Sequence, residues 1–255
     1  MQTDLCAPGG VADLDALAAT VRDGDSREAH AAIRALGALD DDRARTTLGG
    51  ALGGVGLVTA LAIQALGRHG AKARRFAIEA TTDPGRKLGG VAVMGKLGDP
   101  ACCALLRYLV HDPDPQMRLA VASALYRCDE RDGALWSSWI RREDDLAVAA
   151  FLAAIAGGGV TLTCGTLDHL AAQAEDAAMP IEVRVGAAWA VAQHDAAWGE
   201  GLADTLLADP DAAFALASVV RRRGGPLVAK VAGVPGDPEE DLTAESVGLP
   251  RPAAG

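Results

Sequence analysis

Apolar residues recur along this chain at the spacing of one helix face, and the whole pattern returns about every 30 residues. Seven apolar residues mark the same point of successive segments: Leu36, Leu66, Leu97, Leu125, Ile155, Val191 and Val219. Consecutive members are separated by 30, 31, 28, 30, 36 and 28 residues. The residues three and four positions before each of them are also apolar, which places all three on one side of a helix. The pattern predicts a stack of amphipathic helix pairs.

The period divides most of the chain into seven helix pairs. We expect them at residues 11–40, 41–70, 71–98, 100–128, 131–157, 162–194 and 196–223. The fold class predicted is therefore all-α, an α-solenoid of about seven antiparallel helix pairs over residues 11–233. Residues 1–10 are expected to be a flexible N-terminus. Residues 226–231 are expected to form a short capping helix, and the Pro-, Gly- and acid-rich residues 234–255 a disordered tail.

Turn signals separate the predicted helices. Three Asp-Pro pairs lie where helices are expected to begin: Asp99-Pro100, Asp112-Pro113 and Asp209-Pro210. Asp accepts hydrogen bonds from free backbone N–H groups there, and Pro fits the first turn. Three glycines lie where helices are expected to end: Gly37, Gly67 and Gly98. A left-handed residue commonly closes a helix, so we expect this conformation at all three.

The segment from Leu97 to Arg127 resembles the HEAT-like repeat of the phycobilisome-lyase type. The matching residues are Leu97-Gly98-Asp99-Pro100, Asp112-Pro113-Asp114-Pro115, Arg118 and Ala124-Leu125. Met117 departs from the pattern, which usually has Val at that point. The resemblance implies a right-handed solenoid whose second helices line a concave face. It does not select a function, because such repeats occur in scaffolds and in enzymes.

Composition narrows the classes of partner. The formal net charge is −10, which opposes non-specific binding to nucleic acid or to an anionic membrane. Two stretches without charge, residues 46–67 and 146–167, are long enough to span a bilayer, but glycine clusters interrupt both and both fit the soluble repeat. We therefore expect no membrane association.

Cysteine usage and the first residues bear on the compartment. Five cysteines are an odd number without regular spacing, which favours reduced, buried side chains. The first ten residues lack the basic and apolar regions of a secretory signal. Arginine greatly outnumbers lysine, as in many GC-rich bacterial sequences. These features predict a bacterial, cytoplasmic protein.

The sequence contains no catalytic signature. Gly90–Lys96 resembles the start of a phosphate-binding loop, but Leu97 stands where Ser or Thr must follow, and the segment lies inside a predicted helix. The five histidines are isolated and none precedes Glu, so we expect no metal site and no cofactor. No position matches the catalytic Asp of the HEAT-like DNA glycosylases considered below.

One polar stripe remains as a candidate binding surface. It consists of the residues opposite the apolar face on the second helices, together with neighbouring arginines: Arg27, Arg34, Gln64, Arg68, Arg118, Ser123, Arg127, Arg184, Trp189, Gln193 and Arg221. Trp189 occupies a position where other repeats have Arg, Gln or Ser, so we expect it outside the core. The same arginines could equally be no more than a solvated helix face.

The charge distribution agrees with a functional stripe. The expected second helices are residues 27–39, 55–69, 84–98, 115–128, 143–157, 180–194 and 210–223. They contain twelve basic and six acidic residues, a balance of 12 − 6 = +6, so the rest of the chain carries −10 − 6 = −16. We therefore predict that the concave surface is less acidic than the convex one.

Three classes of function compete. The first is a non-enzymatic scaffold or adaptor that binds another protein, such as an acidic or extended segment, on its concave face. The second is a lyase-like or other small-molecule-handling enzyme, because HEAT-like bilin lyases bind a propionate-bearing tetrapyrrole and arginines beside apolar residues suit that ligand. The third is a HEAT-like DNA glycosylase. The negative net charge argues against this class. The features in its favour are aromatic and basic residues of the kind that bind DNA, namely Trp136, Trp139, Trp189, Trp198 and Arg221-Arg222-Arg223.

Overall fold

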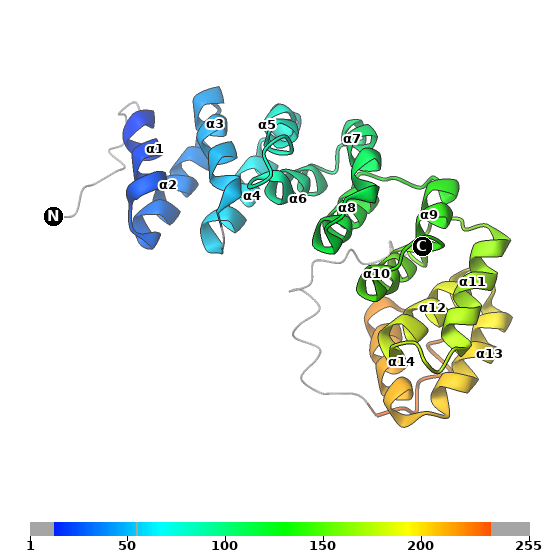
Figure 1. The fold of residues 1–255 in the computed structure, drawn as a ribbon. Coiled ribbons are helices and arrows are strands. Elements are labelled where there is room, and N and C mark those ends of the chain that lie inside the picture. Colours follow the sequence, from blue (N-terminus) through cyan, green and yellow to red (C-terminus); the bar gives the residue numbers. More distant parts are fainter. Residues whose placement is uncertain (1–12, 55, 236–255) are drawn as a thin grey trace. The chain divides into compact units, whose positions relative to one another are not determined.

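A computed structural model describes residues 13–54 and 56–235, and the regular structure in these ranges is all helical, with no strand (Figure 1). The α-helices of this part are α1 Leu14–Asp23, α2 Ser26–Ala38, α3 Asp42–Gly50, α4 Leu57–Arg68, α5 Arg74–Ala80, α6 Lys87–Leu97, α7 Cys103–Tyr108, α8 Pro115–Arg127, α9 Gly133–Ile140, α10 Leu146–Ala156, α11 Cys164–Glu175, α12 Ile181–His194, α13 Ala196–Leu207 and α14 Pro210–Arg223. Short 3₁₀ segments are η1 Ala51–Gly53, η2 Gly70–Ala73, η3 Pro100–Cys102 and η4 Leu109–His111. The all-α prediction is confirmed.

The even-numbered helices are the second helices that the apolar period predicts. Their observed ends differ from the predicted ends by at most three residues, as for α6, which begins at Lys87 instead of residue 84. Five of the seven predicted first helices begin with an odd-numbered α-helix within three residues of the predicted boundary. In the other two, the short segments η2 and η3 precede α5 and α7. The period of about 30 residues therefore located the helices correctly.

The chain forms two compact units. The first comprises the described residues up to His111 together with Arg127–Asp129, and the second comprises Asp112–Tyr126 and the described residues from Glu130 onward. In the first unit α2 packs on α1 and α4, and α4 in turn packs on α6. The odd-numbered helices α1, α3 and α5 contact one another in the same order.

The second unit repeats this arrangement. Helix α12 lies at its centre, because it packs on α10, α11, α13 and α14. Every residue of α12 from Val183 to Ala192 is consequently buried. Trp136, Ile140, Leu152 and Leu170 are among the fully buried side chains of this unit.

The cores are built mainly from leucine, valine and alanine. In the first unit Ile33, Leu36, Leu48, Leu66 and Met94 are fully buried. Burying one such side chain stabilises a fold by about 1.5–3 kcal/mol. The buried alanines between them allow neighbouring helices to approach closely, which explains an apolar composition with few aromatic residues.

Aspartates cap many of the helices. In the described residues, an aspartate carboxylate accepts backbone N–H hydrogen bonds at the start of eight α-helices. These aspartates are Asp13, Asp25, Asp41, Asp114, Asp132, Asp145, Asp195 and Asp209. Asp99 does the same for η3. Each such cap contributes about 1 kcal/mol, so part of the negative charge stabilises helix ends. Of the three predicted Asp-Pro caps Asp112 is the exception, because α8 begins at Pro115 and Asp114 accepts the bond from the Gln116 N–H.

The three glycines predicted to end helices behave differently from one another. Gly98 adopts the left-handed conformation, with φ of 60°. Gly37 and Gly67 lie within α2 and α4, so the prediction is wrong for them. They are required for a different reason: a Cβ on Gly37 would lie 2.8 Å from the Cβ of Ala65, and one on Gly67 would lie 2.4 Å from the Cγ of Lys96. These glycines let α2, α4 and α6 approach one another.

The predicted capping helix at residues 226–231 is wrong, because this segment forms a series of turns. Gly224 and Gly225 both have positive φ and break the helical path, yet Leu227 and Val231 are buried. The predicted N-terminus at 1–10 lies outside the described residues. So does the predicted tail, except for residues 234 and 235. Within the described ranges, no helix has the length and apolar character needed to cross a membrane.

Candidate binding site

The first-unit part of the stripe lies where α2 and α4 run side by side. Ile33 and Arg34 of α2 border the same space as Leu61 of α4, and one turn further on Gly37 meets Ala65. The two helices therefore run in the same direction, in a register of 28 residues from Ile33 to Leu61 and from Gly37 to Ala65. This register brings the exposed faces of neighbouring repeats together.

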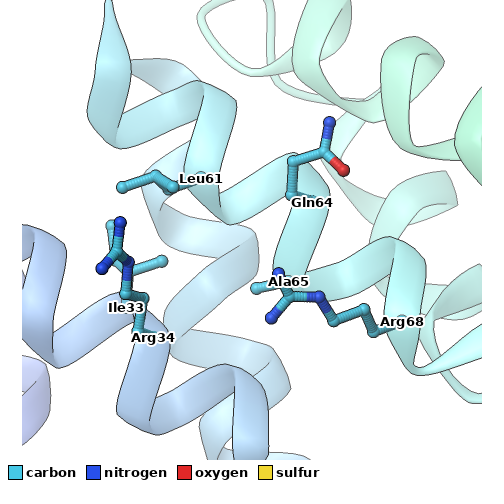
Figure 2. A pocket seen from close by; sticks show the side chains of 6 residues that line it. All are labelled: Ile33, Arg34, Leu61, Gln64, Ala65 and Arg68. Carbon is cyan, nitrogen blue, oxygen red and sulfur yellow. The ribbon is translucent and has the colours of Figure 1, made fainter.

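A pocket of about 310 Å³ opens between these helices, and Figure 2 shows its lining. It is lined by Ile33, Arg34, Leu61, Gln64, Ala65 and Arg68. Ile33 and Ala65 are buried and form an apolar floor, whereas Arg34, Gln64 and Arg68 are exposed. The Arg34 side chain extends toward Leu61 of α4, and that of Arg68 extends from α4 toward α2 (Figure 2).

Neither guanidinium group has an acidic partner in the part of the chain that the structure describes. The ion pairs and side-chain hydrogen bonds within it include neither Arg34 nor Arg68, and the amide of Gln64 is equally unengaged. A guanidinium carries five N–H donors in a planar fork that matches a carboxylate or phosphate. Two of them beside one amide therefore present a set of donors that matches an oxyanion chemically.

Cations on α3, η2 and α5 of the same unit are arranged differently. The Arg45 guanidinium is buried and bonded to Asp40 at 2.9 Å and to Asp42 at 2.5 Å. Lys72 pairs with Asp40, and Arg75 pairs with Asp42. Hydrogen bonds from Lys72 and Arg45 hold the pKa of Asp40 below its usual value, and the bond from Arg45 does the same for Asp42. These charges neutralise each other and leave no open anion site.

His69 follows the pocket at the end of α4. Its Nε2 is buried without a hydrogen-bond partner, and burial lowers the pKa of the ring, with a further contribution from the positive charge of Arg45. The opposing charge of Asp40 is too weak to reverse this direction. A neutral ring at pH 7 is the consequence, so His69 adds no positive charge beside Arg68.

In the second unit the predicted stripe residue Arg118 belongs to a buried ion pair. Its Nε and Nη2 donate to the two carboxylate oxygens of Glu143, at 3.0 and 2.6 Å, and its Nη1 donates to the carbonyl oxygens of Asp112 and Pro113. The Glu143 side chain is only 2% exposed and also accepts from the Trp139 indole. Glu143 raises the pKa of Arg118. This arginine is a structural residue.

Trp189 is buried, so the expectation that it lies outside the core is wrong. Its ring packs against Gly157, where a Cβ would lie 2.2 Å from the ring, and its Nε1 donates to the Gly224 carbonyl at 3.1 Å. The Arg223 guanidinium lies 5.1 Å from the ring centroid and donates to the Ala154 carbonyl at 2.6 Å. Burial, with the nearby charge of Arg222, lowers the pKa of Arg223.

The remaining stripe residues differ in burial and in hydrogen-bond partners. Arg184 is buried and donates to the Ala174 carbonyl at 3.2 Å. Gln193 is half-buried beside Gly225, with an unpartnered Nε2. Arg221 is exposed but donates to the Val234 carbonyl. Arg27 and Arg127 are exposed and Ser123 is half-buried. Of the predicted stripe, the structure brings Arg34, Gln64 and Arg68 together in one pocket.

The tryptophans that invited comparison with DNA glycosylases are structural. Trp136 and Trp139 are buried and stack on each other with ring centroids 5.8 Å apart. Trp189 is buried as described, and Trp198 is half-buried on α13. Buried rings cannot stack on nucleotide bases, so this part of the comparison is not supported by the structure.

Residues 13–54 and 56–235 were also compared with the requirements of a metal site, a phosphate-binding loop and a reactive thiol. No group of three or more His, Cys, Asp or Glu side chains could hold a metal there. The Gly90–Lys96 motif lies within α6, as the sequence predicts, so it forms no phosphate loop. Cys102 and Cys128 are buried free thiols, and the hydrogen bond between them, together with burial, raises the pKa of Cys128.

Sequence reasoning missed the pocket's apolar lining. Ile33 and Ala65 read as core residues, and Leu61 was not singled out. Exposed leucines also interrupt the stripe, with Leu57 58% and Leu88 44% exposed. The helical period places Leu57 and Leu88 opposite the apolar face, but a single sequence does not show that Leu61 borders a pocket, because the pocket depends on how α2 packs against α4.

The comparisons with known proteins add no relative. No protein-family model matches the chain, and no curated protein matches it. The resemblance to HEAT-like repeats therefore rests on the residues quoted above.

Proposed function

We propose that this chain is a non-enzymatic scaffold or adaptor of the HEAT-like type, which binds an acidic segment of another protein. The contact surface is the pocket formed by Arg34, Gln64 and Arg68. One observation carries the proposal: two exposed guanidinium groups share a pocket and have no acidic partner among the described residues. An unpaired arginine pair is a surface suited to carboxylates.

The solenoid is part of this proposal. In each unit an even-numbered helix packs on the next even-numbered helix, as α2 does on α4 and α12 on α14. The glycine contacts Gly37–Ala65 and Gly67–Lys96 repeat with nearly the same sequence separation. Such nearest-neighbour packing is what a right-handed HEAT-like solenoid of about seven antiparallel helix pairs requires.

The size of the pocket favours a side chain over a large ligand. A volume of about 310 Å³ lies at the lower end of the range for small-molecule sites, about 300–1,000 Å³. One or two acidic side chains fit such a space. A tetrapyrrole handled by a lyase would also need arginines beside apolar residues, but its four rings would extend well beyond the lining residues.

Nucleic acid is disfavoured for two reasons. The net charge of −10 opposes a polyanion, and the basic triplet Arg221–Arg223 is engaged within the second unit. A short acidic segment needs only a local positive patch, because salt at physiological concentration screens charges more than about 8 Å away.

The proposal is tested with a fluorescein-labelled peptide of alternating Glu and Ser, amidated at its C-terminus, followed by fluorescence anisotropy. The chain is expected to bind it, and affinity is expected to fall as salt rises. The double variant Arg34→Ala/Arg68→Ala is expected to weaken binding by about tenfold or more, since one charge-assisted hydrogen bond corresponds to about 1.5–3 kcal/mol.

The matched control is the double variant Arg43→Ala/Arg75→Ala. It removes the same charge from exposed arginines of α3 and α5 that pair with Asp15 and Asp42. Its affinity for the peptide is expected to stay within about twofold of the parent, because screened charges at a distance contribute little. Equal loss in both double variants, or no binding by the parent chain, would overturn the proposal.

A further inference from the structure

Two exposed leucines lie on the same row of helices as the arginine pocket. Leu57, the first residue of α4, is 58% exposed, and Leu88, the second residue of α6, is 44% exposed. They occupy the same position of successive repeats. Large apolar side chains on adjacent helices, beside a polar rim, are typical of a protein contact surface.

The packing of α4 and α6 places these leucines at the same end of the row. A Cβ on Gly89, near the start of α6, would lie 2.6 Å from the Leu52 carbonyl oxygen, shortly before α4 begins. Near the other end, Gly67 of α4 meets Lys96 of α6. The two helices therefore run in the same direction, and their first turns are neighbours.

The exposed face of α4 changes from apolar to cationic along the length of the helix. Leu57 is followed one turn later by Leu61, which lines the pocket, and then by Gln64 and Arg68. Leu57 and Arg68 are separated by about 16 Å along the axis of the 12-residue helix α4, and the pocket's midpoint near Gln64 lies about 11 Å from Leu57. An apolar end thus lies about 11–16 Å from a cationic end on one face.

We propose that this surface binds an extended acidic segment that carries an apolar side chain four residues from the acid. The acid lies between Arg34 and Arg68, and the apolar side chain lies on Leu57 and Leu88. In an extended chain, residues four apart point to the same side and are about 13 Å apart, which matches the length of the α4 face. The inference rests on the proposed function and specifies which acidic segments the pocket would bind, namely those with an apolar side chain at this spacing.

Charge complementarity selects this occupant over a purely apolar one. Burying Leu57 under an uncharged partner would leave the two guanidinium groups without partners at the border of the contact. A partner with an acid at the correct spacing covers the apolar end and pairs the arginines at once.

The test compares three amidated, fluorescein-labelled peptides in anisotropy titrations: an acid-only peptide with one Glu among Ser residues, and two in which one Ser becomes Leu at three or four residues from that Glu. The four-residue spacing is expected to bind about five- to tenfold more tightly than the acid-only peptide, because one leucine becomes buried. The three-residue spacing is expected to give little gain, since that leucine points to the opposite side.

Variants separate the two contributions. Leu57→Ser/Leu88→Ser is expected to abolish the gain from leucine and to leave binding of the acid-only peptide unchanged. The control Leu146→Ser removes a leucine that is 43% exposed at the same repeat position of α10, in the second unit, and is expected to keep the gain. Circular dichroism of each variant verifies that it is folded.

The outcomes distinguish this inference from the proposed function. If the acid-only peptide binds through Arg34 and Arg68 but no leucine spacing improves affinity, the inference is overturned and the proposed function stands. If no peptide binds, both fall. Sedimentation velocity adds a further outcome: a parent chain that dimerises through Leu57 and Leu88, and a Leu57→Ser/Leu88→Ser chain that is monomeric, would identify a second copy as the occupant and overturn the inference.

Discussion

The arginines of α2 and α4 in the first unit differ from the arginine of α8 in the second, although all three lie on even-numbered helices. Arg34 and Arg68 are exposed and have no acidic partner within the described residues. The Arg118 side chain is 12% exposed, and Glu143 binds it with two hydrogen bonds. Residue type and helical position therefore do not make a binding site. An arginine is available for a ligand only where the fold supplies no carboxylate.

Trp189, the aromatic residue of the stripe, also shows that repeat position alone does not determine exposure. Trp189 occupies in α12 the repeat position that Arg34 occupies in α2, but it is buried where Arg34 is exposed. Gly157 leaves space for its ring, and the turn at Gly224 supplies an acceptor for its indole N–H. Trp189 therefore has a structural role in the second unit, and the binding surface that we propose lies in the first.

The largest effect is expected for Trp189→Ala. Removing a buried indole ring should lower the free energy of unfolding by about 3–5 kcal/mol, because a cavity remains between α10, α12 and the turn at Gly224. Urea denaturation followed by circular dichroism measures this. Trp189→Phe, which keeps most of the packing and loses the bond to the Gly224 carbonyl, should cost less. A change below about 1 kcal/mol for Trp189→Ala would mean that the ring is not part of the core.

The next effect is expected for Glu143→Gln. This change leaves the Arg118 guanidinium, on a side chain only 12% exposed, without its buried carboxylate partner, at a cost of about 3 kcal/mol. All four tryptophans lie in the second unit, so their fluorescence during urea denaturation follows that unit. The control is Asp144→Asn, whose carboxylate lies 3.6 Å from Arg118 but is 95% exposed. It should change stability by less than about 0.5 kcal/mol, and equal effects would contradict the assignment.

A smaller effect is expected for Gly37→Ala. Its new methyl group meets Ala65 at 2.8 Å, so α2 and α4 must separate, at a cost of about 1–2 kcal/mol. The matched control is Gly50→Ala at the end of α3, where a Cβ meets nothing within 4 Å. It should stabilise by about 0.5–1 kcal/mol because alanine favours helix. Thermal unfolding by circular dichroism compares the two. A stabilising Gly37→Ala would show that the helices need not approach so closely.

The smallest effect on stability, with a large effect on binding, is expected for Gln64→Glu. The new carboxylate lies four residues before Arg68 and should stabilise the helix by about 0.3–0.5 kcal/mol. It would also give the first unit the internal acid that the second unit has in Glu143. Binding of the acidic peptide should therefore be lost in anisotropy titrations, whereas Gln64→Ala should weaken binding by less than about threefold. Retained binding by Gln64→Glu would contradict the role of Arg34 and Arg68.

Much of the fold and part of the site could be predicted from the sequence. The helical period follows from the burial of apolar residues on one face, so the even-numbered helices and the common face of Arg34, Gln64 and Arg68 were predictable. The ion pair between Arg118 and Glu143 was not, because the partners are 25 residues apart and acids at turns usually remain solvated. The burial of Trp189 depends on Gly157 and Gly224, which are distant from it in sequence, so no local sequence pattern predicts it.

The sequence by itself determined where the helices lie, which face of each is apolar, and which side chains share the opposite face. These properties depend on local periodicity and on capping residues such as Asp25 and Asp209. Only the tertiary structure decided which arginines have carboxylate partners, which tryptophans are buried, and that α2 and α4 leave a pocket between them. The physical reason is that burial and ion pairing depend on residues from different helices. The pattern within one helix does not identify the residues that will contact it.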